Sequence, residues 1–110
     1  MKIHLIKRQS IENYARKNAS SRASFGTWLS IIKRVDWFEP NEIISTFNSV
    51  DILGKGSDRV VFNIGGNNYR LICKYHFGKT RVHLFVKWIG THAEYENLCK
   101  EGKQYEINIY

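Results

Sequence analysis

The sequence lacks the long apolar runs of a membrane protein. No apolar stretch approaches the roughly 18 residues that span a bilayer. Residues 1–4 lead into Arg8 and Glu12 without the apolar centre of a signal peptide. From these absences we expect a soluble protein of the cytoplasm.

Cysteine is scarce as well, with Cys73 and Cys99 the two in the chain. Without a secretory signal, the expected state is two buried, reduced thiols rather than a disulfide. Cys73 and His76 are three residues apart on a predicted strand, where side chains alternate between faces, so they cannot share a metal ion. The sequence therefore predicts no metal and no other cofactor.

Repeats, low-complexity tracts and linkers that would divide the chain are also missing. The 110 residues are 43% hydrophobic and 14% aromatic. This is enough for an ordinary core that buries about two-thirds of the surface exposed by the unfolded chain. We therefore expect one folded domain that covers residues 1–110.

Acidic residues are fewer than basic ones, 10 against 17, which gives a net charge of +7. The excess is concentrated in residues 52–90, which carry seven basic side chains and one acidic side chain. Such a concentration is typical of a surface that binds a polyanion. A basic surface that is merely solvated is the alternative.

The amino-terminal half predicts one strand and two helices. Residues 2–6 alternate weakly, as in a strand, and Ser10 could cap a short helix over residues 11–18. A clearer helix follows the cap candidates Ser20 and Ser21, because apolar residues recur there at helical spacing: Phe25, Trp28, Leu29, Ile32 and Val35. Residues 36–57 show no clear pattern beyond a possible helical turn over 42–47.

From residue 59 the pattern has the period of two that is typical of strands. A turn centred on Gly66 and Asn67 joins residues 59–64 to 69–77 and predicts apolar pairs: Val60 with Cys73, Phe62 with Leu71 and Ile64 with Tyr69. A second turn, centred on Gly78 and Lys79, predicts four more: Tyr75 with Val82, Cys73 with Leu84, Leu71 with Val86 and Tyr69 with Trp88. The middle strand should bury this face.

The opposite face of the meander is predicted to be basic. It collects Arg59, Val61, Asn63, Arg70, Ile72, Lys74, His76, Arg81, His83, Phe85 and Lys87. Like charges that face each other destabilise a sheet, and a bound polyanion would offset that repulsion.

A capping box follows the third strand of the meander. Thr91 and Glu94 have the spacing at which each side chain accepts a hydrogen bond from the other's backbone amide. The pattern predicts a helix that runs to about Lys100 and stops at Gly102. Apolar and polar residues alternate again over 105–109, which suggests a last short strand. The fold class is α+β.

Two segments carry a resemblance to a known family. Residues 61–71 (VFNIGGNNYRL) and 88–95 (WIGTHAEY) closely resemble the HigB toxins of the RelE superfamily, and the similarity is strong over residues 60–96. The resemblance implies the RelE-like fold, in which an antiparallel meander packs against N-terminal helices and is followed by a short C-terminal helix. It also implies the toxin of a bacterial type II toxin–antitoxin pair, which inhibits growth.

The same resemblance implies an activity and partners. Toxins of this kind are mRNA interferases that cleave mRNA in the ribosomal A site without a metal, by attack of a ribose 2′-hydroxyl on the adjacent phosphate. A HigA-like helix-turn-helix antitoxin would hold the toxin in check, with a higher-order complex on operator DNA as a further expectation. The alternatives are a non-catalytic RNA-binding module and a protein-interaction module that use the same basic face.

The resemblance directs attention to three candidate catalytic residues. Arg70 matches the strand arginine that contacts the scissile phosphate in RelE-type toxins, although it could simply line the groove. His92 follows the Thr91 cap, where amide dipoles disfavour imidazolium, so we expect a neutral ring that can accept a proton, or else a plain surface histidine. Tyr95 shares its helix face and could stack on a base, orient the ribose or pack on the sheet.

Further RNA contacts are expected on the strands: Arg59, Asn63, Lys74, His76, Arg81, His83 and Lys87. Lys74 and Lys87 would contact phosphates, or be solvated. RelE has lysines on the first meander strand where this chain has Val61 and Asn63, and an arginine near the position of His92. These departures leave the general base open, with His4, His76 and His83 as further candidates.

Overall fold

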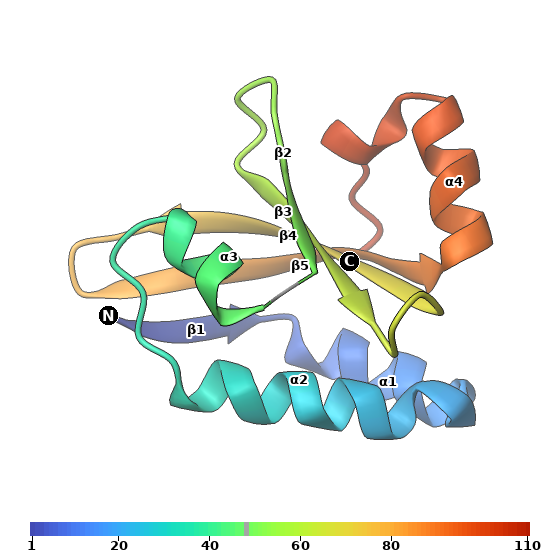
Figure 1. Cartoon of the computed structure of the whole chain (residues 1–110), viewed down its shortest axis with the longest axis horizontal. Coiled ribbons are helices and arrows are strands. Elements are labelled where there is room, and N and C mark those ends of the chain that lie inside the picture. Colours follow the sequence, from blue (N-terminus) through green and yellow to red (C-terminus); the bar gives the residue numbers. More distant parts are fainter. Residues whose placement is uncertain (48) are drawn as a thin grey trace.

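Five strands and four α-helices make up the computed structural model, which describes residues 1–47 and 49–110. In chain order these are β1 (Lys2–Ile6), α1 (Arg8–Lys17), α2 (Arg22–Arg34), α3 (Asn41–Thr46), β2 (Val50–Leu53), β3 (Arg59–Ile64), β4 (Tyr69–Phe77), β5 (Arg81–Thr91) and α4 (His92–Lys100). The strands form one sheet in the order β1-β5-β4-β3-β2 (Figure 1). β1 is parallel to β5, and the other neighbours are antiparallel. The predicted α+β class is confirmed.

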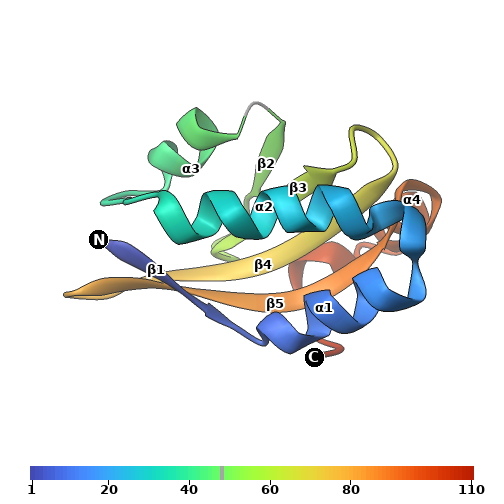
Figure 2. The same ribbon diagram turned by 90° about the horizontal axis from the view of Figure 1, so that it is seen from below.

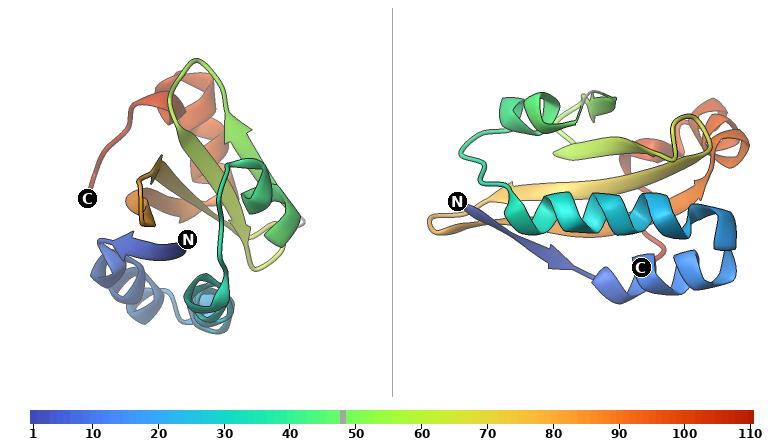
Figure 3. Two further views of the ribbon diagram at one scale, coloured as in Figure 1. Left: turned by 90° about the vertical axis from the view of Figure 1, so that its left-hand side faces the viewer. Right: turned by 60° about the horizontal axis from the view of Figure 1, so that its bottom comes forward.

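The sheet separates two hydrophobic layers. α1 and α2 run along one face (Figure 2), and α4 lies beyond the other (Figure 3). The larger core lies between the sheet and the first three helices and includes Ile11, Phe25, Trp28, Ile32 and Ile43. The predicted strand core is confirmed for six residues that are at most 1% exposed: Val60, Phe62, Leu71, Cys73, Leu84 and Val86. Tyr69 and Tyr75, predicted on the same buried face, are only partly buried.

A smaller hydrophobic layer lies under α4. It consists of Leu53, Val61, Ile72, Trp88 and Leu98, with Tyr95, Tyr105 and Ile107 packed against it. We call this group the α4 cluster. No helix in the described part of the chain is long and apolar enough to cross a membrane.

The amino-terminal elements agree with the sequence except at their ends. α1 begins at Arg8, earlier than predicted, because the chain reverses at Lys7 with a φ of 73°. Ser10 therefore lies inside the helix instead of capping it. The Ser21 hydroxyl donates to the Asn18 carbonyl and the Ser20 hydroxyl contacts the Tyr69 hydroxyl, so none of the three predicted serines makes a capping bond at its helix.

The segment that the sequence left unassigned contains α3 and β2. The predicted helical turn is confirmed as α3, but β2 was missed. It pairs with β3 through Val50 opposite Phe62 and Ile52 opposite Val60. A four-residue edge strand interrupted by Asp51 gives too little alternation to be recognised.

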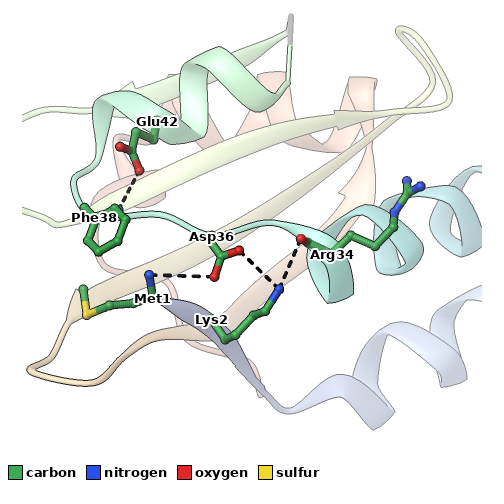
Figure 4. A network of polar contacts seen from close by, with 6 residues as sticks. All are labelled: Met1, Lys2, Arg34, Asp36, Phe38 and Glu42. Carbon is green, nitrogen blue, oxygen red and sulfur yellow. Dashed lines mark hydrogen bonds and ion pairs between the residues drawn. The ribbon is translucent and has the colours of Figure 1, made fainter.

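A polar network ties β1 to the chain that follows α2 (Figure 4). The Lys2 ammonium lies 3.3 Å from the Asp36 carboxylate and donates to the Arg34 carbonyl, also at 3.3 Å. The Trp37 amide donates to the Met1 carbonyl at 2.9 Å. These contacts hold β1 beside β5, at the end of the sheet far from α4.

The register of the meander was predicted correctly for one hairpin and wrongly for the other. β3 and β4 pair as expected, with Phe62 opposite Leu71. At the second hairpin the Gly78 amide donates to the Arg81 carbonyl at 3.0 Å, so the turn is centred on residues 79–80. Tyr75 consequently faces Leu84 instead of Val82. A shift of two residues keeps each side chain on its predicted face.

A bulge in β5 moves part of that strand to the other face. Cys73 pairs with Val86 but Ile72 pairs with Trp88, which leaves Lys87 as the extra residue. Trp88 was predicted on the face of Leu71 and instead lies in the α4 cluster. The bulge lets both Val86 and Trp88 point into a hydrophobic core, one on each side of the sheet.

The capping box was predicted correctly and the last strand was not. The Thr91 hydroxyl accepts from the Glu94 amide at 3.2 Å, and the Glu94 carboxylate accepts from the Thr91 amide at 2.8 Å. After α4, Gly102 has a φ of 69° and leads into a 3₁₀ turn at Lys103–Tyr105. The predicted strand over 105–109 is absent from the described structure, because Tyr105 and Ile107 pack onto the α4 cluster.

Candidate functional site

The predicted basic face is divided into two parts by the α4 cluster. Val61 and Ile72 lie at its centre and are buried beneath α4, at 2% and 0% exposure. One charged region remains where β4 meets the start of α4, and another remains toward the β4–β5 turn. The predicted basic face is therefore interrupted by buried apolar residues.

Arg70 lies at the α4 end of β4, opposite Gly90 on β5, and is 7% exposed. Its Nη1 donates to the Tyr69 carbonyl at 3.0 Å, and its Nη2 lies 2.6 Å from Oδ1 of Asn67 and 2.8 Å from Nδ1 of His92. The Nε hydrogen and one Nη1 hydrogen have no partner among the described residues. A nearly buried guanidinium is thus held in place with two donors left for an anion.

His92 is the first residue of α4 and is held on both sides of its ring. Because arginine can only donate, the contact with Arg70 requires a lone pair on Nδ1. Nε2 then carries the proton and donates to Oε1 of Glu96 at 3.0 Å. These two contacts together place the ring hydrogen on Nε2 and leave the lone pair of Nδ1 toward Arg70.

The turn between β3 and β4 aligns these two residues. Gly65 and Gly66 adopt positive φ values of 65° and 66°, which brings Asn67 back over Arg70. The His92 amide donates to the Asn68 carbonyl at 3.0 Å. The turn therefore fixes the start of α4 against the end of β4, and with it the distance between the guanidinium and the imidazole.

Tyr95 lies one turn farther along α4 and is half-buried. Its ring packs on Trp88, with centroids 6.2 Å apart. Burial, followed by the adjacent Cys99 thiol and the charge of Asp51, raises the pKa of the Tyr95 hydroxyl above its usual value. Tyr95 therefore keeps its proton over the physiological pH range and can donate a hydrogen bond, but it cannot act as a base there.

Arg70, His92 and Tyr95 line one open hollow together with Glu96, Cys99 and Lys100. Arg70, His92 and Tyr95 were predicted from the sequence, whereas the roles of Asn67, Glu96 and Lys100 at this site were not. Glu96 could have been found, because residues four apart on a helix are neighbours. Asn67 could not, because its approach to Arg70 depends on the geometry of the turn. Cys99 was predicted buried but is only half-buried at this hollow.

The second charged region contains Lys74 and Lys87. The Lys87 ammonium lies over the Phe85 ring, 5.6 Å from its centroid. Partial burial lowers the pKa of Lys87, and the nearby charges of Arg59, Lys74 and Lys7 lower it further. These positive charges therefore repel one another in the folded chain.

Two of the predicted strand contacts have other partners in the structure. Arg59 is 5% exposed and donates from Nη1 to the Gln104 carbonyl at 3.1 Å. Asn63 donates from Nδ2 to the Ser49 hydroxyl. Arg59 has little surface left for RNA, and it holds the segment that follows α4. Arg81 is exposed at the start of β5, next to the turn.

The remaining histidines form a row on neighbouring strands. His83 is paired with His4 on one side and His76 on the other, with ring centroids 5.6 and 6.0 Å away. His76 is six residues from Arg70 along β4, which corresponds to about 20 Å. None of these rings can share a substrate atom with Arg70. In the described part of the chain, no three His, Cys, Asp or Glu side chains are grouped to hold a metal ion.

Comparison with known proteins identifies the family. A family model described as HigB toxin, the RelE-like toxic component of a toxin–antitoxin system, matches residues 21–98. The mRNA interferase HigB of Escherichia coli O6:H1 (strain CFT073) is 32% identical over 98 residues, which cover 89% of this chain and 93% of the relative. The chain belongs to the HigB toxin family.

Other HigB toxins are similar at lower identity. The mRNA interferase toxin HigB of Escherichia coli K12 and the mRNA interferase HigB of Shigella flexneri are each 23% identical over 94 residues, which cover 86% of this chain and 88% of each relative. The region matched by the HigB family model includes Arg70, His92, Tyr95 and Glu96. The family resemblance drawn from the sequence is confirmed.

Proposed function

We propose that this HigB-family toxin is a ribosome-dependent endoribonuclease that cleaves mRNA in the ribosomal A site without a metal ion, in the cytoplasm. The contact between Arg70 and His92 at the edge of an open hollow carries this proposal. Attack of a 2′-hydroxyl on a phosphate needs a cation for the developing charge and a base for the proton. Arg70 and His92 are these two groups, and they are already in contact.

The reaction begins when a phosphate of the mRNA enters the hollow. Its oxygens accept hydrogen bonds from the unpartnered donors of Arg70, and Nη2 then leaves Nδ1 of His92 to join them. Nδ1 is thereby free to accept the proton of the 2′-hydroxyl. Arg70 thus keeps the base occupied until a phosphate replaces it.

Glu96 supports His92 during the proton transfer. When Nδ1 accepts the proton, the ring becomes an imidazolium whose Nε2 hydrogen already points at the Glu96 carboxylate. A carboxylate in that position holds the tautomer and stabilises the charged ring, as in the Ser-His-Asp triad. Glu96 is therefore a positioning residue in this mechanism.

Bond making and breaking follow from the direction of attack. The 2′-oxygen forms a bond to phosphorus while the bond from phosphorus to the 5′-oxygen breaks. One fragment ends in a 2′,3′-cyclic phosphate, and the other begins with a 5′-hydroxyl after the leaving oxygen takes up a proton. Tyr95, which keeps its own proton, donates a hydrogen bond to the substrate or stacks on a base.

The second charged region serves binding rather than chemistry. Lys74 lies four residues from Arg70 along β4, about 13 Å away, and with Lys87 it would contact ribosomal or messenger phosphates. His76, Arg81 and His83 extend this surface toward the β4–β5 turn. A HigA-like antitoxin would restrain the toxin, with a complex of the two on operator DNA as a further expectation.

The test is cleavage of mRNA on purified ribosomes. The wild-type protein should cut mRNA held in the A site, leave 2′,3′-cyclic phosphate and 5′-hydroxyl ends, and retain activity in EDTA concentrations that keep the ribosomes intact. Arg70→Ala should abolish the cuts, whereas Arg34→Ala, an exposed arginine on the opposite helical layer, should not. Ribosome binding without cuts would indicate the non-catalytic alternative instead.

A further inference from the structure

The hollow at Arg70 extends along the whole of α4. It has a volume of about 520 Å³. Apart from Arg70, its lining residues all come from this helix: His92, Tyr95, Glu96, Cys99 and Lys100. Their spacing of three and four residues places them in one stripe on the helix surface. The hollow is therefore a groove that follows α4 from its first residue to its last. We call it the α4 groove.

A basic side chain lies at each end of the α4 groove. Arg70 contacts His92 at the start of the helix, and Lys100 is exposed at its end. His92 and Lys100 are eight residues apart, which corresponds to about 12 Å along the helix axis. The two cations are therefore arranged to contact an elongated anion at two points.

Lys100 has no carboxylate within ion-pair distance in the part of the chain that the structure describes. Glu96 precedes it by four residues, the order and spacing that favour an ion pair on a helix. The Glu96 carboxylate lies instead 3.0 Å from Nε2 of His92. Lys103, just beyond the helix, lies 2.6 Å from Glu101. Because His92 occupies Glu96, the charge of Lys100 is available to an anion from outside the chain.

The order of side chains along the α4 groove matches a nucleotide chain. Tyr95 and Cys99 lie between the two cations, and both are partly exposed. An aromatic ring and a polarisable sulfur suit the face of a base. A single small anion would use only one end of the groove. An acidic peptide would pair with both cations but would make no use of an imidazole placed to accept a proton.

We propose that Lys100 binds the mRNA phosphate next to the scissile one, with the intervening nucleotide over Tyr95 and Cys99. This inference rests on the cleavage activity proposed above and identifies how the substrate lies in the site. Lys100 is two helical turns from the reacting atoms, so it holds the substrate and the transition state equally. Such uniform binding changes the concentration needed for cleavage and leaves the maximal rate unchanged.

The test measures binding to ribosomes whose A-site codon carries 2′-deoxy nucleotides, so that no cleavage occurs. Lys100→Gln should weaken binding by about fivefold. Lys100→Arg should retain wild-type affinity because it keeps the charge. The matched control is Lys103→Gln, which removes the neighbouring paired lysine and should have no effect on binding.

Neutral linkages identify the phosphate that Lys100 contacts. Each phosphate of the A-site codon is replaced in turn by a methylphosphonate, which carries no charge. At one phosphate beside the scissile one, the replacement should weaken binding of the wild type by about the same factor as Lys100→Gln. The same replacement should leave the affinity of Lys100→Gln unchanged, because the partner of that phosphate is already missing.

Three results would overturn the inference. The first is wild-type affinity of Lys100→Gln, and the second is a set of neutral linkages that each weaken the wild type and Lys100→Gln equally. The third comes from cleavage of unmodified mRNA. Lys100→Gln should need more toxin for the half-maximal rate and reach the wild-type single-turnover rate, and a lower maximal rate would place Lys100 at the scissile phosphate. If the wild type does not cut, the proposed activity fails, while the binding measurements still decide whether Lys100 holds an mRNA phosphate.

Discussion

Nη2 of Arg70 lies 2.8 Å from Nδ1 of His92, so the cation and the imidazole form one unit before any RNA arrives. The contact fixes the tautomer of the ring, because the guanidinium can only donate. Glu96 completes the unit from the other side of the ring at 3.0 Å. In the proposed mechanism, proton transfer and charge stabilisation are linked through this hydrogen bond, which the substrate must replace.

Replacing Glu96 should reveal its positioning role. Glu96→Gln keeps the shape of the side chain but removes the charge that stabilises the imidazolium, and we expect the rate of cleavage to fall by about 10²-fold. The matched control is Glu101→Gln, an exposed glutamate that follows the same helix. Single-turnover cleavage measures both. Equal rates for the two variants would show that Glu96 does not support His92.

The variant Tyr95→Phe tests whether the Tyr95 hydroxyl acts as a hydrogen-bond donor or as a base. Because burial raises the pKa of the hydroxyl, it stays protonated throughout the range in which ribosomes can be assayed. We expect a lower cleavage rate with an unchanged shape of the pH–rate profile, since no ionisation of Tyr95 contributes to it. A profile that loses a limb in Tyr95→Phe would instead give the tyrosine the proton-transfer role.

Gly90 is required because Trp88 covers it. A Cβ at position 90 would lie 2.6 Å from Cζ2 of the Trp88 ring, and that ring packs on Tyr95. Gly90→Ala should lower the free energy of unfolding by about 1–3 kcal/mol through overpacking, or roughly 4–12 °C in Tm for a domain of this size. Gly54→Ala, where a Cβ meets nothing within 4 Å, is the control. Equal melting temperatures would contradict the packing described here.

Lys87 should be unfavourable for stability and favourable for binding. The pKa of Lys87 is lower in the folded protein than in the unfolded chain. The charged side chain therefore lowers the free energy of unfolding at pH values where it is protonated in both the folded and the unfolded state. The free energy of unfolding rises as the pH approaches the ordinary pKa of 10.5. Lys87→Met should therefore have a higher Tm than the wild type at pH 7, and the difference should shrink toward pH 10.

The matched control for Lys87 is Lys79→Met in the exposed β4–β5 turn. It should change neither the Tm nor its pH dependence. Ribosome affinity should fall for Lys87→Met and become less sensitive to salt, because one phosphate contact is lost. A Tm difference that grows with pH would mean that the sign of the Lys87 effect is wrong.

The sequence predicts the parts of this fold that depend on local pattern. The β3–β4 register follows from alternation around a turn rich in glycine and asparagine, and the start of α4 follows from the spacing of Thr91 and Glu94. The β5 bulge at Lys87 could not be predicted, because it depends on packing on both faces of the sheet. Val86 packs in the core on one face, and Trp88 packs in the α4 cluster on the other. The last strand was wrong for a related reason, since Ile107 alternates with polar residues yet packs under α4 without pairing.

The candidate site was predicted in part. Arg70, His92 and Tyr95 converge on one hollow as the motifs implied, whereas His76 and His83 lie about 20 Å along the sheet. Their faces were assigned correctly, but alternation places residues on a face without limiting their distance from one another. The division of the basic face was missed, because burial of Val61 and Ile72 requires α4 to fold back over the sheet.

The central claim is that Arg70 stabilises charge while His92 transfers a proton. Single-turnover cleavage of A-site mRNA across pH tests it most directly. His92→Gln should lower the rate by about 10²–10⁴-fold and remove one limb of the pH–rate profile. Arg70→Ala should lower the rate by about 10²–10³-fold and keep both limbs. A His92→Gln protein that folds and cleaves at the wild-type rate with both limbs intact would contradict the account.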